Sequence, residues 1–453
     1  MKQLINEAIG FSHFESLYPD NTRFDEIEKI LSFIKEGSSC QVVGVPGSGR
    51  SNILGLLSYN RNIRIKHLGE NQKWFHFVLL NFSEIRNKPL LDVTKFIFLG
   101  ILDSLRERGM SEEYETINAL FKESIGFNDE LVLFQGLKKT IDFLAIEKEL
   151  TVVLLFDRFE DYIPSLTSDF FANLRVLRNR AKYRFSVVFS TRKPIEDVLE
   201  PVFFSDFYEF VAGNIVYLKL YDKEGLDFRI SYLEKVTGKK IDRKDIDKII
   251  ALTGGHGNLA RRCLEALLAA SNQQLAASSK LVEFFLKQKP VRSGLFAIWN
   301  SLNPSEQNIL SLINFGDNDL SYLENIGLIK NNKLTIPLLK DYIKDSARIK
   351  SESKGEIIFD ENTNEIKKGE VVLSDKLTSS EFKLLKFLIQ NSGKVLERDE
   401  IIKSVWKDTQ STAGVTDQAL DQLIFRLRKK IETDPNTPIH ILTVKGRGFR
   451  FIP

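Results

Sequence analysis

A short glycine-rich segment constrains this chain more than any other feature. Residues 44–51 read Gly-Val-Pro-Gly-Ser-Gly-Arg-Ser. The order fits the pattern G-x-x-x-x-G-K-[ST], in which backbone N–H groups close around phosphate oxygens, except that Arg50 stands where lysine is usual. Ser51 supplies the hydroxyl that such a loop offers to Mg²⁺. The segment therefore predicts a nucleotide site and leaves hydrolysis open.

The surroundings of this segment predict a parallel sheet covered by helices. Short apolar runs at 41–45, 75–82, 151–156, 185–190 and 215–220 alternate with helix-length stretches, which is typical of that architecture. The glycine segment lies between the first run and a helical stretch, where a phosphate loop must be. The residues of this region expected to bind nucleotide are Gly44, Pro46, Gly47, Ser48, Gly49, Arg50, Ser51 and Asn52.

The third apolar run ends in a carboxylate, Asp157. An acidic side chain at a strand tip can hold Mg²⁺ with the loop hydroxyl, so Asp157 and Ser51 are the expected metal ligands. In many ATPases of this kind a glutamate follows at once and polarises the attacking water, but here Arg158 follows. Glu160 and Asp161 are the candidate catalytic bases; the alternative is that both are solvated loop charges.

Two further segments, LLFDRFED at 154–161 and FSVVFSTR at 185–192, resemble the STAND branch of AAA+-like ATPases. A third, LTGGHGNLARR at 252–262, resembles the lid of AAA+ and origin-recognition-like ATPases. The resemblance covers roughly residues 20–290. It implies ATP or ADP as ligand, with Mg²⁺, a P-loop core and a helical lid.

The same resemblance assigns roles to arginines outside the glycine segment. Arg192, a rigid fork of donors, would reach a γ-phosphate, although it could also be a surface charge at a strand end. Arg261 or Arg262 would be the sensor arginine of the lid. His256 is expected to be a turn residue, because no partner for a metal site lies near it in the sequence.

Residues 291–345 are predicted to form a small winged helix. Pro304 follows a capping position and opens a helix, and a helix, strand and wing are expected from 321 to 336. The candidate recognition face around Asp317, Asn318, Asp319 and Glu324 is acidic, and acidic groups repel phosphates. The segment is therefore expected to serve structure, regulation or a protein partner instead of DNA.

Residues 356–453 resemble the winged-helix domain of OmpR/PhoB-type response regulators along their whole length. An alternating stretch at 357–373 predicts an antiparallel meander, and Thr378 with Glu381 has capping-box spacing. The sequence 443–451, TVKGRGFRF, matches the hairpin wing of that family, and 415–431 is the candidate recognition helix. The resemblance implies binding to double-stranded DNA.

The charge distribution in this region supports the same partner. Basic residues outnumber acids from 423 to the end, as phosphate attraction requires. Phe425 and Lys445 depart from the arginines that relatives often carry, which weakens the case for guanine readout. The alternative is a winged helix turned to protein contacts. The expected DNA contacts are Thr416, Gln418, Gln422, Arg426, Arg428, Lys429, Lys430, Thr443, Lys445 and Arg447.

The expected architecture is multidomain α/β plus α+β. The predicted parts are a P-loop parallel αβα sandwich (1–221), a helical lid (222–290), a winged-helix-like domain (291–345), a linker (346–355) and the OmpR-like winged helix (356–453). As a flexible coil the linker would span about 18 Å. The formal net charge of +3 identifies no partner, and the two cysteines fit a reducing compartment. With neither a signal peptide nor a membrane span in view, the cytoplasm is expected.

Three functional hypotheses arise from the combination. The leading one is a nucleotide-switched, DNA-binding transcription regulator that self-associates, as a homo-oligomer, when ATP closes the module. The second is a DNA-targeted ATPase of a defence or mobile-element system, and the third is a scaffold with a degenerate nucleotide site. A weak or regulated ATPase activity is compatible with the first two.

Overall fold

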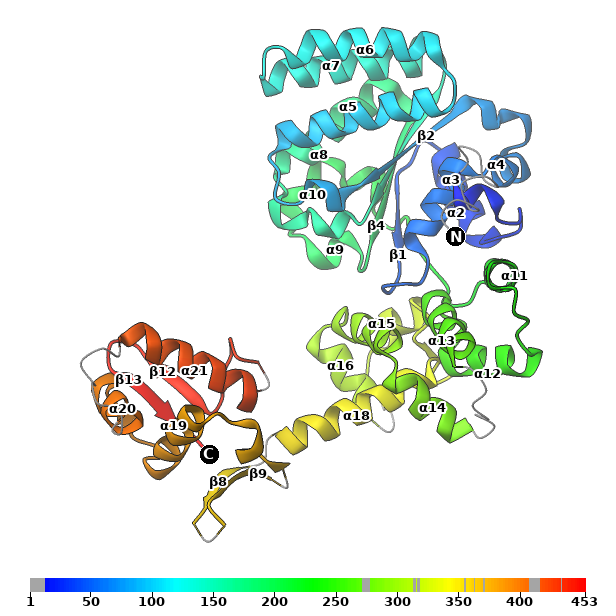
Figure 1. Cartoon of the computed structure of the whole chain (residues 1–453). Helices are drawn as coiled ribbons and strands as arrows, with labels where there is room; N and C mark the ends of the chain where they lie inside the picture. The colour runs from blue at the N-terminus through cyan, green and yellow to red at the C-terminus, as the bar shows by residue number, and fades with distance from the viewer. Residues whose placement is uncertain are drawn as a thin grey trace. The chain divides into compact units, whose positions relative to one another are not determined.

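A five-stranded parallel sheet forms the centre of the first part of the chain (Figure 1). The computed structural model describes residues 13–270, 278–312, 315, 318–353, 356–361, 363–369, 371–406, 416–432 and 434–453. These divide into two units, Met1–Asp341 and Tyr342–Pro453. The strands of the parallel sheet are β1 Cys40–Val43, β2 Phe75–Asn81, β3 Thr151–Asp157, β4 Phe185–Thr191 and β5 Ile215–Tyr217.

The strand order β2-β3-β4-β1-β5 places β1 between β4 and β5. Val42 lies opposite Ser190 on one side and Val216 on the other. The chain turns from one half of the sheet to the other at this point, which is where open α/β sheets form a ligand crevice at the carboxyl ends of their strands. The glycine segment begins at that edge, directly after β1.

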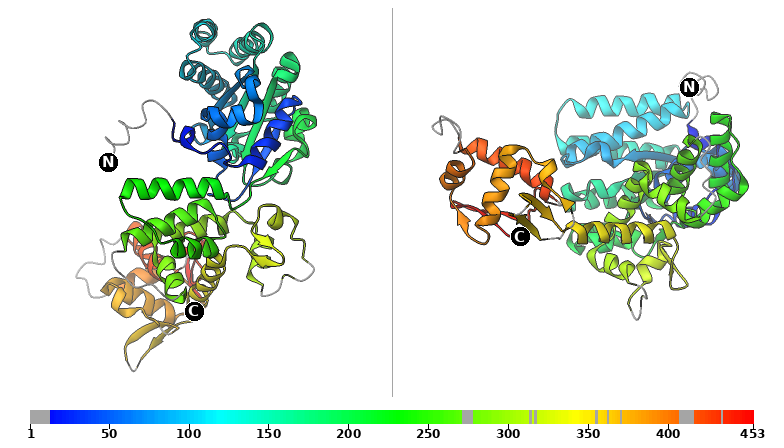
Figure 2. Two further views of the ribbon diagram at one scale, coloured as in Figure 1. Left: turned by 90° about the vertical axis from the view of Figure 1, so that its right-hand side faces the viewer. Right: turned by 60° about the horizontal axis from the view of Figure 1, so that its bottom comes forward.

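Helices cover both faces of the sheet, which explains why the strands are nearly continuous apolar runs. One face packs against α2 Phe24–Lys35, α3 Arg50–Tyr59 and α4 Arg61–Leu68. The other packs against α5 Leu90–Glu107, α7 Glu130–Asp142, α8 Ser168–Ala181 and α10 Pro201–Val211, with many phenylalanine rings in mutual contact. α6 Ser111–Ile125 packs on α5 and α7, as the turned views show (Figure 2).

The remainder of the first unit is mostly helical. Its longer helices are α11 Lys223–Thr237, α12 Arg243–Thr253, α13 Gly257–Ala269, α14 Ser278–Lys287, α15 Lys289–Asn300, α16 Pro304–Ser311 and α17 Ser321–Asn325, followed by the hairpin β6 Ile329–Lys330 and β7 Lys333–Leu334. Asn303 and Glu306 form a capping box at the start of α16. Short helical segments are η1 Phe14–Leu17, η2 Gly69–Trp74, η3 Phe82–Ile85, η4 Phe143–Glu147, η5 Phe159–Asp161, η6 Ile163–Ser165, η7 Lys182–Arg184 and α9 Ile195–Val198.

The second unit has the expected meander, three helices and a terminal hairpin. The meander is β8 Ile357–Asp360, β9 Glu365–Lys368 and β10 Val371–Val372. After η8 Ser374–Lys376 come α19 Ser379–Gln390, β11 Val395–Leu396, α20 Arg398–Val405, α21 Asp417–Ile431, β12 Ile441–Val444 and β13 Gly448–Phe451. Thr378 and Glu381 form the predicted capping box of α19. This arrangement confirms a C-terminal winged-helix domain.

The predicted linker is wrong in one respect. We expected 346–355 to be a flexible coil, but α18 runs from Pro337 to Ser353. Lysine, arginine, alanine and isoleucine are good or tolerable helix formers, and a proline at the first position suits a helix start. α18 thus begins in the first unit and continues into the second. The finer boundaries at 221/222 and 290/291 stay predictions.

Two sequence predictions fall on residues that the structure does not describe. These are Asp317, in the acidic group of the small winged helix, and Val415, at the expected start of the recognition helix. Within the described ranges, no helix has both the length and the apolar character needed to cross a bilayer.

Candidate nucleotide site and nucleic-acid interface

The glycine segment forms a tight loop between β1 and α3. Gly47 and Gly49 have φ angles of 84° and 108°, which side-chain-bearing residues rarely adopt. A Cβ on Gly47 would lie 2.8 Å from Cε1 of His256 and 2.9 Å from Cβ of Asn258. Gly47 is therefore required by the approach of another chain segment as well as by the turn. The N-terminus of α3 faces the loop, as a phosphate site needs.

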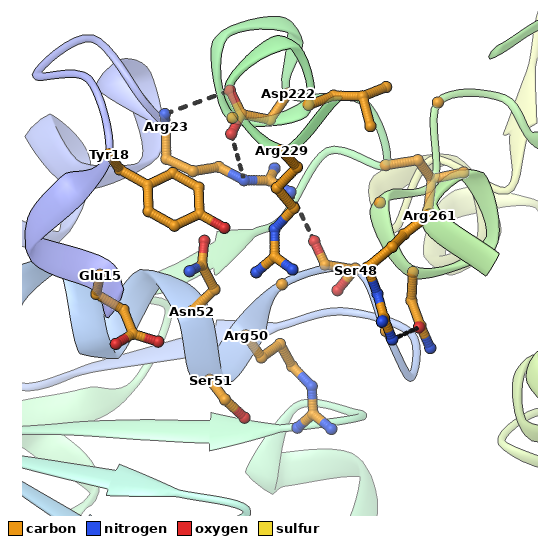
Figure 3. Close-up of a pocket in the computed structure, with 18 residues that line it drawn as sticks. Glu15, Tyr18, Arg23, Ser48, Arg50, Ser51, Asn52, Asp222, Arg229 and Arg261 are labelled. Atoms are coloured by element: carbon orange, nitrogen blue, oxygen red, sulfur yellow. Dashed lines mark hydrogen bonds and ion pairs between the residues drawn. The ribbon is translucent and has the colours of Figure 1, made fainter. Parts of the chain in front are cut away.

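A cavity of about 380 Å³ lies beside this loop (Figure 3). Its walls come from three parts of the first unit: the segment before α2, the loop with the start of α3, and the region from Leu220 to Arg261. Seven of the expected nucleotide residues are among its lining, namely Gly47, Ser48, Gly49, Arg50, Ser51, Asn52 and Arg261. The other two residues predicted in this segment, Gly44 and Pro46, belong to the loop but do not line the cavity.

The lining of the cavity also includes apolar side chains and a further cation. Tyr18, Leu220 and Leu226 are among the lining residues, and Arg229 points into the cavity between Tyr18 and the loop (Figure 3). The Arg229 guanidinium lies 5.5 Å from the Tyr18 ring centroid, within cation–π range. The sequence analysis missed these residues, because isolated tyrosines and helix arginines carry no spacing signal.

Two residues of the loop that line the cavity, Ser48 and Ser51, carry hydroxyl groups. The Ser48 hydroxyl is buried without a hydrogen-bond partner among the described residues. Ser51 Oγ donates to Asp157 Oδ1 over 3.0 Å, as expected for a shared metal pair. Burial raises the pKa of Asp157, while the Ser51 hydrogen bond and Arg50 act to lower it. A divalent cation at this carboxylate would relieve the cost of burying its charge.

The donor set fits Mg²⁺ bound mainly through phosphate and water. In the described ranges, no group of three or more His, Cys, Asp or Glu side chains gathers into a metal cage. Mg²⁺ is usually held by one or two protein oxygens together with substrate phosphates. Ser51 and Asp157 supply that number. The chemistry this ion would add is neutralisation of charge on the phosphates.

Arg50 does not extend freely into the cavity. Its guanidinium donates to both carboxylate oxygens of Glu160, over 3.1 and 2.8 Å. Arg192 Nε also donates to Glu160, over 3.0 Å. The two arginines and Glu160 are thus brought together at the edge of the sheet, and Glu160 already holds two cations.

Asp161, the other candidate base, lies in a different environment. Its carboxylate pairs with Arg86 and with Arg158, and it does not line the nucleotide cavity. A second cavity of about 230 Å³, lined by Glu160, Asp161 and Arg192 among others, lies at this side. Arg158 itself has a left-handed φ of 54°, which turns the chain sharply after the tip of β3.

A buried arginine that the sequence analysis did not single out connects the walls of the cavity. Arg23 Nη2 donates to the Ser48 carbonyl, and Nη1 donates to the Lys219 carbonyl, each over 2.6 Å. Its Nη1 also pairs with Glu26, and its Nε lies 3.7 Å from Asp222. Arg23 therefore fastens the phosphate loop to the chain that leads into α11.

His256 makes the second fastening. Its Nδ1 accepts from the Leu259 N–H over 3.2 Å, capping α13, so the proton must lie on Nε2, which is 3.0 Å from the Pro46 carbonyl. Burial lowers the pKa of His256 to about 4. The ring is thus neutral and links α13 to the loop. The expected turn role holds, with a capping role added to it.

Arg261 and Arg262 point in different directions. Arg261 lines the cavity and pairs with Glu265 over 2.8 Å. Arg262 donates to Asn258 and to the Pro290 carbonyl on α15. Of the two, Arg261 is placed to meet a ligand.

The small helical segment that comes after the lid packs against the core next to Arg192. Tyr322 Oη donates to the Arg192 carbonyl over 2.8 Å. Lys193 pairs with Glu306 over 2.5 Å, with both side chains mostly buried, and its ammonium lies 4.6 Å from the Tyr322 ring centroid. Asp319 and Glu324 stay exposed. Arg192, which contacts Glu160, is thus followed directly in the chain by Lys193, which holds α16 through Glu306.

In the second unit, some predicted DNA contacts are engaged within the domain. Arg428 donates to the Ile441 carbonyl and to Thr443 Oγ1. Lys430 donates to Glu381 and to the Lys376 carbonyl. The structure therefore gives both side chains a role in holding α21 to its neighbours. Thr416 is the N-cap of α21.

The other predicted contacts are exposed on α21 and the wing. On the helix these are Gln418, Gln422, Arg426 and Lys429, and on the hairpin Lys445 and Arg447. A groove of about 700 Å³ runs between the wing and the starts of α20 and α21. A helix beside a basic hairpin is the surface that winged helices present to a duplex.

Comparisons with known proteins support a regulator domain at the C-terminus. Residues 374–451 match the family model "Transcriptional regulatory protein, C terminal". The chain is 36% identical to the probable transcriptional regulator ycf27 of Guillardia theta over 241 residues, which are 53% of this chain and 76% of the relative. It is 45% identical to the sensory transduction protein RegX3 of Mycobacterium tuberculosis over 74 residues, 16% of this chain and 31% of that protein.

One solved structure is similar to a large part of this chain. The Walker-type ATPase PABY2304 of Pyrococcus abyssi aligns over 74% of this chain and 97% of its own, with 13% identity and a TM-score of 0.44. Values this low carry no functional argument, so the case for a bound nucleotide rests on the geometry of the loop and the cavity.

Proposed function

Because the chain belongs to the family of transcriptional regulators that share this C-terminal domain, we propose that it is a DNA-binding regulator switched by a nucleotide. In this proposal the first unit is an ATPase-like module of the STAND or AAA+ kind. It binds ATP or ADP with Mg²⁺, and its nucleotide state controls how the winged helix meets double-stranded DNA.

The observation that supports this proposal best is the composition of the cavity walls. Tyr18, the phosphate loop and Arg261 lie on separate segments of the first unit. A ligand with a flat base and a charged tail would contact all three at once. Such a ligand can shift a conformational equilibrium, because its contacts exist only when the segments are together.

The contacts of Glu160 favour a switch over a fast motor. Glu160 is held by Arg50 and Arg192, and Asp161 by Arg86 and Arg158. Each of these two candidate catalytic bases is thus already paired with two arginines. A triphosphate would compete with Glu160 for the two guanidiniums, so its arrival would rearrange the edge of the sheet.

The edge of the sheet also contacts the small segment that precedes α18 in the chain. Arg192 is next to Lys193, which pairs with Glu306, and the same small segment leads into α18. We infer that nucleotide binding is passed on through these contacts. Self-association as a homo-oligomer would then pair two winged helices on adjacent half-sites. The exposed Asp319 and Glu324 leave a face for a protein partner.

One experiment separates this proposal from its alternatives. ATP binding and hydrolysis are measured for the full chain and for Arg50→Lys and Asp157→Ala, with and without DNA. Binding with little turnover supports the switch. DNA-stimulated turnover supports a DNA-targeted ATPase, which the intact Ser51–Asp157 pair favours. Absence of both supports a scaffold with a degenerate site.

DNA binding has its own test. The affinity of the full chain for duplex DNA is measured against salt concentration. A dimer that neutralises about 8 phosphates should give a log–log slope of about −7. A flat response would contradict DNA binding.

A further inference from the structure

The exposed face of α21 carries amide and aromatic side chains as well as positive charge. Leu420, Leu423, Ile424, Leu427 and Ile431 are buried. The opposite face presents Gln418, Gln422, Phe425, Arg426 and Lys429, which recur at helical spacing. Amides and one aromatic ring thus occupy the first half of that face.

Two of the remaining cations cannot read bases without breaking contacts inside the domain. Arg428 is tied to Ile441 and Thr443, and Lys430 to Glu381. Arg398 neutralises Asp421 from α20, over 2.8 Å. Arg426 and Lys429 are exposed cations of α21 for which no ion pair is recorded among the described residues, and both follow the glutamines in the chain.

Phe425 is the apolar exception on this polar face. Its side chain is 44% exposed. The ammonium of Lys429 lies 4.6 Å from its ring centroid, which leaves the other side of the ring uncovered by that contact. An exposed aromatic on a helix that enters the major groove meets the apolar groups of the bases.

The major groove has one strongly apolar group, the C5-methyl of thymine. Glutamine pairs with the N6 and N7 edge of adenine, whereas guanine is read by a bidentate arginine or lysine. Gln422 lies three residues before Phe425, on the same face. The two side chains together match an A·T base pair or adjacent A·T pairs.

We propose that Phe425 is a specificity-determining residue that, with Gln422, directs α21 to A·T base pairs by contacting the C5-methyl of thymine. The proposal rests on the DNA binding proposed above and names the bases which that site prefers. It assigns the basic wing to sequence-independent contacts.

The test uses the full chain and a pool of random duplexes. Bound sequences are selected, and in the selected site each thymine is replaced in turn by uracil, which removes only the methyl group. One replacement should weaken binding about fourfold, the value of one buried methyl-sized group. In Phe425→Ala that difference should vanish, whereas Phe425→Leu should keep part of it.

Two controls make the result specific. Lys445→Ala, on the wing, should weaken binding to all sequences alike and leave the thymine–uracil ratio unchanged. Melting of each variant checks folding, which the exposure of Phe425 predicts to be intact. Selection of G·C-rich sites, or an unchanged thymine–uracil ratio in Phe425→Ala, overturns the proposal.

Failure of this proposal and failure of DNA binding are distinguishable. Salt-dependent binding without any thymine–uracil difference overturns the role of Phe425 and leaves DNA binding standing. Absence of binding even at low salt overturns both.

Discussion

Arg50 and Glu160 form a two-pronged ion pair, with the guanidinium donating to both carboxylate oxygens over 3.1 and 2.8 Å. The pair is mostly buried, with side-chain exposures of 11% and 14%. A lysine at position 50 could not make this fork. The arginine at position 50 is therefore matched to Glu160.

This pairing predicts how Glu160→Gln should behave. Removing the carboxylate charge frees Arg50 and Arg192 and takes away repulsion of the triphosphate. We expect ATP affinity to rise about tenfold, or ~1.4 kcal/mol, with a smaller gain for ADP. Isothermal titration would measure both. Asp161→Asn is the matched control, because Asp161 pairs with other arginines and its loss should leave affinity unchanged.

Asp157→Asn should abolish the contribution of Mg²⁺ to ATP binding. We expect Mg²⁺-dependent affinity to fall by about tenfold or more, with Mg²⁺-free binding unaffected. Burial raises the pKa of Asp157, so this carboxylate is protonated at a higher pH than an ordinary aspartate. The effect of Mg²⁺ on ATP affinity should therefore be lost at a correspondingly higher pH on acidification. The ligand-free variant should be no less stable, because the native carboxylate is costly to bury. An Mg²⁺ effect that survives in Asp157→Asn would contradict the assignment.

Much of this architecture is predictable from sequence because burial leaves a simple pattern. The strands of the parallel sheet are covered on both faces and read as uninterrupted apolar runs. Likewise, the spacing of Thr378 and Glu381 is a local rule that holds in the structure. Pairing over long distances leaves no such trace. Nothing around Arg23 indicates that it meets Ser48 and Lys219, and Arg428 looks as free as Arg426 until the fold joins it to β12.

The helix α18 was missed for a related reason. Its second half is charged and lacks an apolar stripe, which in the sequence is indistinguishable from a solvated linker. Helix propensity and continuity with the packed first half decide the outcome instead. Such a segment is visible only when the preceding turns are known to be anchored.

His256 should make the first unit sensitive to acid. Its pKa of about 4 lies below the ordinary 6.5, so the unfolded chain takes up a proton before the native one does. The stabilisation is complete above about pH 6.5 and is lost as pH falls towards 4, by up to about 3 kcal/mol. Urea unfolding across this range would show it. In His256→Asn, which can still cap α13, that part of the pH dependence should disappear. An unchanged pH profile would mean that other groups cause the loss of stability in acid.

The contacts at the end of β4 should be needed for coupling and not for nucleotide binding. Glu306→Gln and Tyr322→Phe each remove one contact to Lys193 or Arg192. We expect ATP affinity within about twofold of wild type, but a several-fold smaller effect of ATP on DNA affinity, since coupling energies are typically about 1–3 kcal/mol. Glu324→Gln, an exposed acid on the same small segment, is the control. Equal loss of coupling in all three variants would argue for a general electrostatic effect.

The basic residues of the second unit should divide into two groups in a salt titration. Lys445→Ala and Arg447→Ala remove exposed charges on the wing, so each should reduce the log–log salt slope of DNA binding by about 0.9 and leave the melting temperature unchanged. Arg428→Ala should instead lower the stability of the unit by ~1–3 kcal/mol, because it leaves the Ile441 carbonyl without its charged donor. Measuring both quantities for all three variants separates phosphate contacts from structural ones. If Arg428→Ala changed the salt slope and not the stability, the hydrogen bonds of Arg428 to β12 would be dispensable for folding. Arg428 would then be a DNA contact, as the sequence predicted.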